Sequence, residues 1–244
     1  AQPHEIIALM GRNGAGKSTL MNVLTGYLAM TEGRAIIGGH DVQKEPLEAR
    51  KLVGYLPEQP SLYPDLTVTE YLRYCAQLKG LPHRGVKAEI DRVIQRTALQ
   101  EYAKRLTSRL SKGYRQRLGM AQALLGKPAL LILDEPSSGL DPLQMVQMRE
   151  LVVSAAEDST VLLSSHMLSE VTNVCTRALI LEQGSLRFDG AMHILLTSAN
   201  TLRLTYSGGE NLPQALRALD SAGPVRVRQE GRLTVFDGPG DEAA

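Results

Sequence analysis

The sequence contains no tryptophan and only two phenylalanines, so aliphatic side chains must supply most of its core. It has two cysteines, Cys75 and Cys175, with no Cys-x-x-Cys or Cys/His spacing around them. Their spacing argues against a disulfide framework or a zinc site and fits a reducing cytoplasm. The formal net charge is only +1, so the composition does not point to nucleic acid as a partner.

Long hydrophobic runs are also missing. No apolar stretch approaches the roughly 20 residues that cross a bilayer, and no signal peptide precedes the first apolar run. If the protein serves a membrane process, another chain has to cross the membrane. Because the sequence opens at Ala1 and closes on the polar segment 238–244, we expect it to be a fragment.

Short apolar runs alternate with helical patterns along most of the chain. The run Glu5–Met10 stops at a glycine-rich turn, after which apolar residues repeat at helical spacing. Further strand-length runs lie at 53–56, 129–133, 160–164 and 178–181, and a helix is expected near 142–156. This alternation predicts an α/β fold with a mostly parallel sheet covered on both faces, into which residues 67–127 insert as a helical subdomain.

The last part of the chain has a different pattern. Residues 201–206 alternate, 212–222 have helical spacing, and 225–229 and 232–236 predict a hairpin around Gly231. We therefore expect a main domain over residues 1–198 and a small α+β appendage over 199–244.

Residues 11–18, Gly-Arg-Asn-Gly-Ala-Gly-Lys-Ser, match the phosphate-binding pattern G-x-x-x-x-G-K-[ST]. Glycines let the backbone wrap around phosphates so that several N–H groups point inward at a helix N-terminus. Lys17 would neutralise the β and γ oxygens, and the Ser18 hydroxyl would hold Mg²⁺. A flexible glycine loop is the alternative, but the position between strand and helix favours nucleotide binding. The predicted nucleotide-binding residues of this loop are Gly11, Asn13, Gly14, Gly16, Lys17, Ser18 and Thr19.

Two adjacent carboxylates, Asp134 and Glu135, follow the apolar run 130–133. At the end of a strand, Asp134 can hold the Mg²⁺ shell while Glu135 polarises the attacking water, a division that P-loop ATPases use. The alternative is a strand followed by a helix-capping carboxylate. His166 follows the next apolar run in the same way. Ligands of open α/β sheets lie outside the carboxyl ends of the strands, so we expect these groups to meet at one edge.

At this point the sequence resembles the ABC (ATP-binding cassette) ATPase family over about residues 5–190. Residues 110–117, Leu-Ser-Lys-Gly-Tyr-Arg-Gln-Arg, look like the family's signature, Gln59 looks like its Q-loop glutamine, and 137–141 look like its D-loop. The resemblance implies a P-loop NTPase fold of ABC type that hydrolyses Mg-ATP. It also implies a dimer, with itself or a paralogous ATPase subunit, that holds ATP between the P-loop of one protomer and the signature of the other.

The resemblance assigns further roles. Ser111 and Gly113 would contact the γ-phosphate in trans, and Asp141 would make a cross-dimer contact. Gln59 would be a metal and water ligand, and His166 would sense the γ-phosphate. Without the resemblance, Ser111 could simply be a helix N-cap and Gln59 a loop residue.

The signature departs from the common form Leu-Ser-Gly-Gly-Gln, because Lys112 and Tyr114 replace a glycine and the final glutamine. This variant resembles the ABC-2 exporter branch of gliding-motility, copper-processing and drug-export type, in which ATPase and permease are separate chains. The signature region also carries a basic cluster. Most such clusters are solvated helix faces, and a specific phosphate or lipid role is the alternative. The members of the cluster are Arg105, Arg109, Lys112, Arg115 and Arg117.

One family element has no counterpart. Cassettes usually begin with strands that carry an aromatic residue for stacking on adenine, and no aromatic residue precedes Gly11. The N-terminal strands are therefore expected to be missing, and the adenine contact has no assigned residue.

We thus predict the ATP-hydrolysing subunit of a transporter, cytoplasmic and peripheral on the inner face of the membrane, with Pro60–Leu66 contacting a separate permease. The main alternative is a soluble ABC ATPase of DNA repair or translation. Such relatives carry long coiled coils or two cassettes, and no sustained heptads separate Gln59 from Ser111. A non-hydrolysing regulatory subunit is a second alternative, against which Glu135 and His166 argue.

Overall fold

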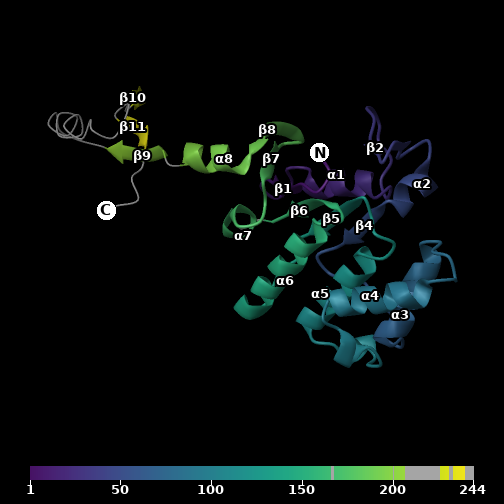
Figure 1. Ribbon diagram of the computed structural model, residues 1–244. Coiled ribbons are helices and arrows are strands. Elements are labelled where there is room, and N and C mark those ends of the chain that lie inside the picture. The colour runs from purple at the N-terminus through teal and green to yellow at the C-terminus, as the bar shows by residue number, and fades with distance from the viewer. Residues whose placement is uncertain (166–167, 200, 207–225, 231–232, 240–244) are drawn as a thin grey trace. The chain divides into compact units, whose positions relative to one another are not determined.

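The computed structural model describes residues 1–165, 168–199, 201–206, 226–230 and 233–239 (Figure 1). The chain divides into two compact units, Ala1–Gly190 and Ala191–Ala244, which are described separately. The domain boundary expected at residue 198 stays a prediction.

A six-stranded sheet forms the centre of the first unit, in the order β4-β5-β6-β1-β7-β8. Its strands are β1 (Ile6–Met10), β4 (Val53–Leu56), β5 (Leu130–Asp134), β6 (Thr160–Ser164), β7 (Arg177–Glu182) and β8 (Ser185–Ala191). All pairs from β4 across to β7 are parallel, which confirms the expected mostly parallel sheet. Strand β8 was not predicted. It follows β7 through Gln183 and Gly184, whose φ angles of 49° and 77° suit a two-residue hairpin turn.

The central strands are aliphatic on both faces because helices cover both sides of the sheet. Leu9, Leu131, Leu133 and Val161 have no exposed surface. Such continuous apolar runs are typical of parallel strands that are buried on both faces. Apart from Tyr71 and Cys175, the buried hydrophobic residues of the described part of the chain are Leu, Ile, Val, Met and Ala, as the scarcity of large aromatics requires.

The helices of the first unit include two that the sequence patterns did not predict, α2 and α7. The helices are α1 (Lys17–Leu24), α2 (Pro46–Lys51), α3 (Val68–Leu78), α4 (Val86–Arg96), α5 (Lys112–Ala123), α6 (Pro142–Ala155) and α7 (Leu168–Thr172), with 3-10 turns η1 (Gln100–Tyr102) and η2 (Thr107–Arg109). A small hairpin joins β2 (Ile36–Ile37) to β3 (His40–Asp41). No helix among the described residues is long and apolar enough to cross a membrane.

Helices α3, α4 and α5 pack on one another and form the group seen beside β4 in Figure 1. Thr67 begins α3 with a capping box, in which its side chain and that of Glu70 bond each other's backbone N–H groups. Helix α5 comes close to β4 because both elements carry glycines at the contact. A methyl group on Gly119 would lie 2.6 Å from a Leu56 carbon, and one on Gly54 would overlap the Ala123 carbonyl oxygen. The helical group is thereby held against the strand that leads to Gln59.

The second unit contains α8 (Met192–Ala199) and an antiparallel sheet in the order β10-β11-β9. Its strands are β9 (Thr201–Tyr206), β10 (Arg226–Glu230) and β11 (Leu233–Pro239). The antiparallel pairing of β10 with β11 agrees with the predicted hairpin. The helix predicted over 212–222 lies outside the described residues.

Candidate functional site

Four parallel strands end at the same edge of the sheet, and within the described part of the chain three of them lead to predicted site residues, Gly11, Gln59 and Asp134. Because β1, β4, β5 and β6 run in the same direction, Gly11, Gln59, Asp134 and Ser164 all stand at or beyond carboxyl ends. The register sets Ser164 beside both Asp134 and Leu9. This is the edge where α/β sheets bind ligands. His166, expected at the same edge, lies outside the described residues.

The glycine-rich loop after β1 has a backbone that only glycine adopts easily. Gly14 and Gly16 have φ angles of 79° and 105°. Gly11, with a φ of 151°, lies against the Leu181 carbonyl oxygen of β7, which leaves no room for a side chain. The turn between β7 and β8 contacts the glycine-rich loop, because the Gly184 N–H donates a hydrogen bond of 3.0 Å to the Ala15 carbonyl oxygen.

Lys17 begins α1 and folds back over this loop. Its Nζ donates to the carbonyl oxygens of Gly11, at 2.6 Å, and Arg12, at 3.3 Å. The first turn of α1 has no acidic residue, and Gly16 caps it without a side-chain bond. A helix N-terminus of this kind, with its positive end and unsatisfied N–H groups, favours an anion. The lysine and the loop together fit a phosphate.

The loop opens onto a cleft of about 540 Å³, whose other wall is the β7–β8 hairpin. Its charged lining residues are Arg12, Glu182 and Arg187, of which Arg187 pairs with Glu182 at 3.0 Å. Asn13, Ser18 and Thr19 are exposed, so the polar groups of the loop are accessible to a ligand.

One serine bonds both Asp134 and Glu135 at the end of β5, the first through its carboxylate and the second through its backbone N–H. The Ser164 hydroxyl donates to Asp134 Oδ1 at 2.6 Å, and the Glu135 N–H donates to Ser164 Oγ at 3.0 Å. Glu135 has a φ of 47°, a left-handed conformation that costs a non-glycine residue about 1–2 kcal/mol. Backbone strain of this kind is concentrated at functional sites.

The D-loop connects the carboxylates with the Q-loop. Ser138 Oγ donates to Glu58 Oε1 at 3.0 Å, next to Gln59, whose own side chain is exposed. Asp141 caps α6, because its Oδ1 accepts from the Gln144 N–H at 2.8 Å. The cross-dimer role expected of Asp141 stays a prediction.

The signature lies at the start of α5 and packs on the D-loop of the same chain. Ser111 is exposed and makes no side-chain cap, so its hydroxyl is available at the surface. A methyl group on Gly113 would come within 2.5 Å of Gln144 Oε1, and the Lys112 side chain lies against Gly139. The contact of Ser111 and Gly113 with a second protomer's nucleotide stays a prediction.

The basic cluster of the signature region divides into two parts. Arg117 is partly buried and donates to the Thr97 carbonyl oxygen at 3.0 Å and to Gln147 Oε1 at 2.5 Å, so its role is structural. Arg105 lies over the Tyr102 ring at 4.9 Å, and Tyr102 stacks on Tyr114. The expectation that such clusters are solvated helix faces therefore does not extend to Arg117.

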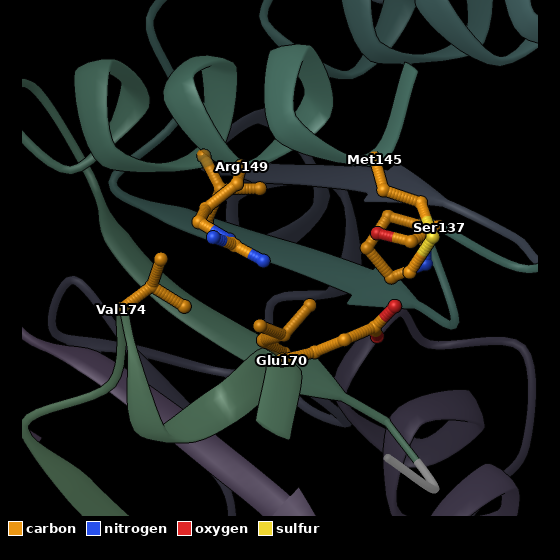
Figure 2. Close-up of a pocket in the computed structure, with 8 residues that line it drawn as sticks. Ser137, Met145, Arg149, Glu170 and Val174 are labelled. Atoms are coloured by element: carbon orange, nitrogen blue, oxygen red, sulfur yellow. The ribbon is translucent and has the colours of Figure 1, made fainter. Parts of the chain in front are cut away.

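Behind the carboxylates, α6 and α7 enclose a small hollow of about 20 Å³, large enough for one water molecule. Figure 2 shows Arg149 of α6 and Glu170 of α7 both directed into it, beside Ser137. Glu170 Oε2 also accepts a bond of 2.8 Å from Ser165, the residue before His166. Sequence reasoning missed Ser164 and Glu170. For Ser164 a usable signal was present, because two serines, Ser164 and Ser165, end the aliphatic run of β6.

The available donors fit a magnesium ion bound together with a nucleotide. No three His, Cys, Asp or Glu side chains of the described part of the chain are grouped as a metal site. Mg²⁺ uses oxygen ligands, commonly one or two carboxylates together with substrate phosphates and waters. The Asp134 carboxylate, the Ser18 hydroxyl and the Gln59 amide oxygen are donors of this class.

Comparisons with known proteins agree with this geometry. A family model described as ABC transporter matches residues 1–138. An uncharacterized ABC transporter ATP-binding protein of Nostoc sp. is 40% identical over 209 residues, which are 84% of this chain and 62% of that protein. The bacitracin transport ATP-binding protein BcrA of Bacillus licheniformis is 40% identical over 184 residues, 75% of this chain and 59% of BcrA. The chain thus spans less than two thirds of the length of both relatives.

A solved structure described as the ATP-binding subunit of an ABC transporter superposes with a TM-score of 0.71 at 31% identity. The match covers 79% of this chain and 80% of that one. The α/β arrangement is therefore shared with a protein of known structure.

Proposed function

The chain belongs to the ABC transporter family, and we propose that it is an ATP-hydrolysing subunit that dimerises around two Mg-ATP and drives a separate membrane permease. One observation carries the proposal. The glycine-rich loop and the residues Asp134 and Glu135 lie at the same edge of one parallel sheet, where Ser164 bonds the Asp134 carboxylate and the Glu135 backbone N–H.

Binding would begin at the glycine-rich loop. The Lys17 ammonium, which now bonds the carbonyl oxygens of Gly11 and Arg12, would exchange these neutral acceptors for phosphate oxygens. A phosphate oxygen carries negative charge, so the ammonium gains an attraction between opposite charges that a carbonyl oxygen does not offer, and the exchange is favourable. When bound, Mg²⁺ would neutralise charge on the β and γ phosphates, held by Ser18, Asp134 and Gln59.

Hydrolysis would depend on Glu135 and on a second protomer. Glu135 polarises the attacking water, while Ser111 and Gly113 of another copy complete the γ-phosphate site in trans. His166 would contact the γ-phosphate, and Asp141 would meet the partner across the dimer. The exposure of Ser111 supports this assignment, since a signature serine must reach another molecule.

The permease would dock on a cleft of about 580 Å³ that β4, α2, α3 and α5 enclose. Its charged lining residues are all cations, namely Arg50, Lys51 and Lys79. Leu47 and Leu78, which also line it, are each 70% exposed. Pro60 lines the cleft as well, at the start of the segment 60–66 expected to touch the permease. An apolar segment that carries carboxylates would match this surface.

This role would place the protein in the cytoplasm, on the inner face of the membrane. The bacitracin transport relative BcrA supports a transport function, and the Lys112–Tyr114 form of the signature supports an exporter. Between Gln59 and Ser111 the helices α3 and α4 have 11 residues each, too short for the coiled coils of soluble DNA-repair relatives.

The test separates binding from hydrolysis. Glu135→Gln should retain ATP binding and lower turnover by about 10²- to 10⁴-fold, as expected for loss of a general base. Lys17→Ala should weaken ATP binding by about 10- to 150-fold, because a bond to a charged phosphate is worth about 1.5–3 kcal/mol. Glu150→Gln, on the exposed part of α6, is the matched control and should change neither quantity. Normal turnover in Glu135→Gln would refute the assignment.

A further inference from the structure

Ser164 is a polar residue in an unusual place. It ends β6 after the aliphatic run Val161-Leu162-Leu163, and none of its surface is exposed. A buried hydroxyl needs a hydrogen-bond partner, because leaving it unpaired costs about 1–3 kcal/mol. Ser164 finds its partners at the catalytic end of the neighbouring strand β5 rather than in its own strand.

The bonds of this hydroxyl join both carboxylate residues of the proposed site. It donates its single proton to Asp134 Oδ1 at 2.6 Å and accepts the Glu135 N–H at 3.0 Å. The Glu135 N–H also donates to the Ser164 backbone carbonyl oxygen, with an N···O distance of 3.2 Å. A hydroxyl has one donor and two acceptor sites, so it can make both bonds at once, which a Val or Ala side chain cannot.

Each bond restrains a different property of the site. The bond to Oδ1 fixes the rotation of the Asp134 carboxylate, the proposed metal ligand. The bond from the Glu135 N–H holds the backbone of Glu135 in its left-handed conformation, with a φ of 47°. Residues that orient metal ligands in this way typically change metal affinity or activity 10- to 100-fold when they are removed.

We propose that Ser164 is a positioning residue that orients Asp134 toward Mg²⁺ and holds Glu135 in place. The inference rests on the proposed function, because it assumes that Asp134 holds the metal of Mg-ATP. It predicts that loss of the hydroxyl lowers metal affinity while nucleotide binding through the glycine-rich loop is retained.

A purely structural role for the hydroxyl would have different consequences, and Ser159 provides the comparison. Ser159 is 1% exposed, immediately precedes β6, and donates to the Pro128 carbonyl oxygen at 2.7 Å. It therefore has an equally buried hydroxyl and a bond of similar length, at the opposite edge of the sheet. Ser159→Ala should lower stability without any effect on the metal.

The experiment measures Mn²⁺ binding by electron paramagnetic resonance, with a non-hydrolysable ATP analogue present. Ser164→Ala should raise the Mn²⁺ dissociation constant about 10-fold or more, while the metal-free affinity for the analogue stays within about twofold. Ser164→Thr keeps the hydroxyl and should restore most of the metal affinity. Ser164→Cys, of similar volume but a weaker donor, should be intermediate and serves as a second variant if Ser164→Ala folds poorly.

Thermal unfolding of each variant reports the structural contribution separately. Wild-type Mn²⁺ affinity in folded Ser164→Ala or Ser164→Cys would overturn the positioning role. An equal loss of metal affinity in Ser159→Ala would also overturn it, since the effect would then be one of stability. If the wild-type chain binds no Mn²⁺ with the nucleotide analogue, the proposed function itself fails, and this inference fails with it.

Discussion

Lys79 offers a test of the electrostatics of the proposed docking cleft. Its Nζ donates to the Leu125 carbonyl oxygen at 2.7 Å, and no ion pair of Lys79 is present among the described residues. Burial lowers the pKa of Lys79 from its ordinary value of 10.5 to about 8, and the Glu89 carboxylate opposes this shift only in part. The folded protein thus bears the cost of burying a cation.

The sign of the pH dependence follows from the two pKa values. Because the folded pKa is below the unfolded one, the unfolded chain holds the proton more tightly between pH 8 and 10.5. Stability should therefore rise with pH in this window, by about 1 kcal/mol from pH 7 to 9 and about 2 kcal/mol from pH 7 to 10. Lys79→Met removes the titrating group and with it this part of the pH dependence.

Urea unfolding of wild type and Lys79→Met at pH 7, 8, 9 and 10 gives the required difference. Other groups titrate equally in both proteins, so only the difference between the two curves is interpreted. Lys87→Met, at an exposed position of α4, should keep the wild-type pH dependence. Parallel curves for wild type and Lys79→Met would refute the reasoning. An acidic permease segment in the cleft should raise the pKa of Lys79 toward its ordinary value.

Two further predictions concern assembly and the D-loop. In light scattering, Glu135→Gln should be monomeric without ATP and dimeric with it. A second substitution, Ser111→Arg, should abolish that dimer. Ser108→Arg, at another exposed serine, is the control and should leave the dimer intact. A nucleotide-dependent dimer that survives Ser111→Arg would argue against the signature contact in trans. Asp141→Ala should lower the free energy of unfolding by about 1 kcal/mol through the lost cap, or the melting temperature by about 2–4 °C. Asp91→Ala, at an exposed position of α4, should change either quantity little. An unchanged melting temperature in Asp141→Ala would contradict the capping role.

The sequence by itself determined the strands of the core and the polar groups at their ends. Short aliphatic runs that stop at proline, carboxylate or serine residues favour buried strands that end at a loop, so 53–56, 129–133 and 160–164 were predicted almost to the residue. The glycine-rich loop was also predicted, because its glycines are needed for the backbone itself, whereas the roles of its residues stay predictions. Local patterns were weaker for α2 and α7, which are short, and for β8, which is mostly exposed. None of these three elements was predicted from the sequence.

Only the tertiary structure decided which strands are neighbours and which side chains meet. Nothing in the sequence of β6 says that Ser164 stands beside Asp134, because that depends on the register between two strands that α6 separates. Arg117 looked like a member of an exposed basic cluster until its bonds to Thr97 and Gln147 were seen. Periodicity reports whether a residue faces a core, since burial depends on local spacing. Hydrogen-bond partners far apart in the chain depend on packing, which local spacing does not encode.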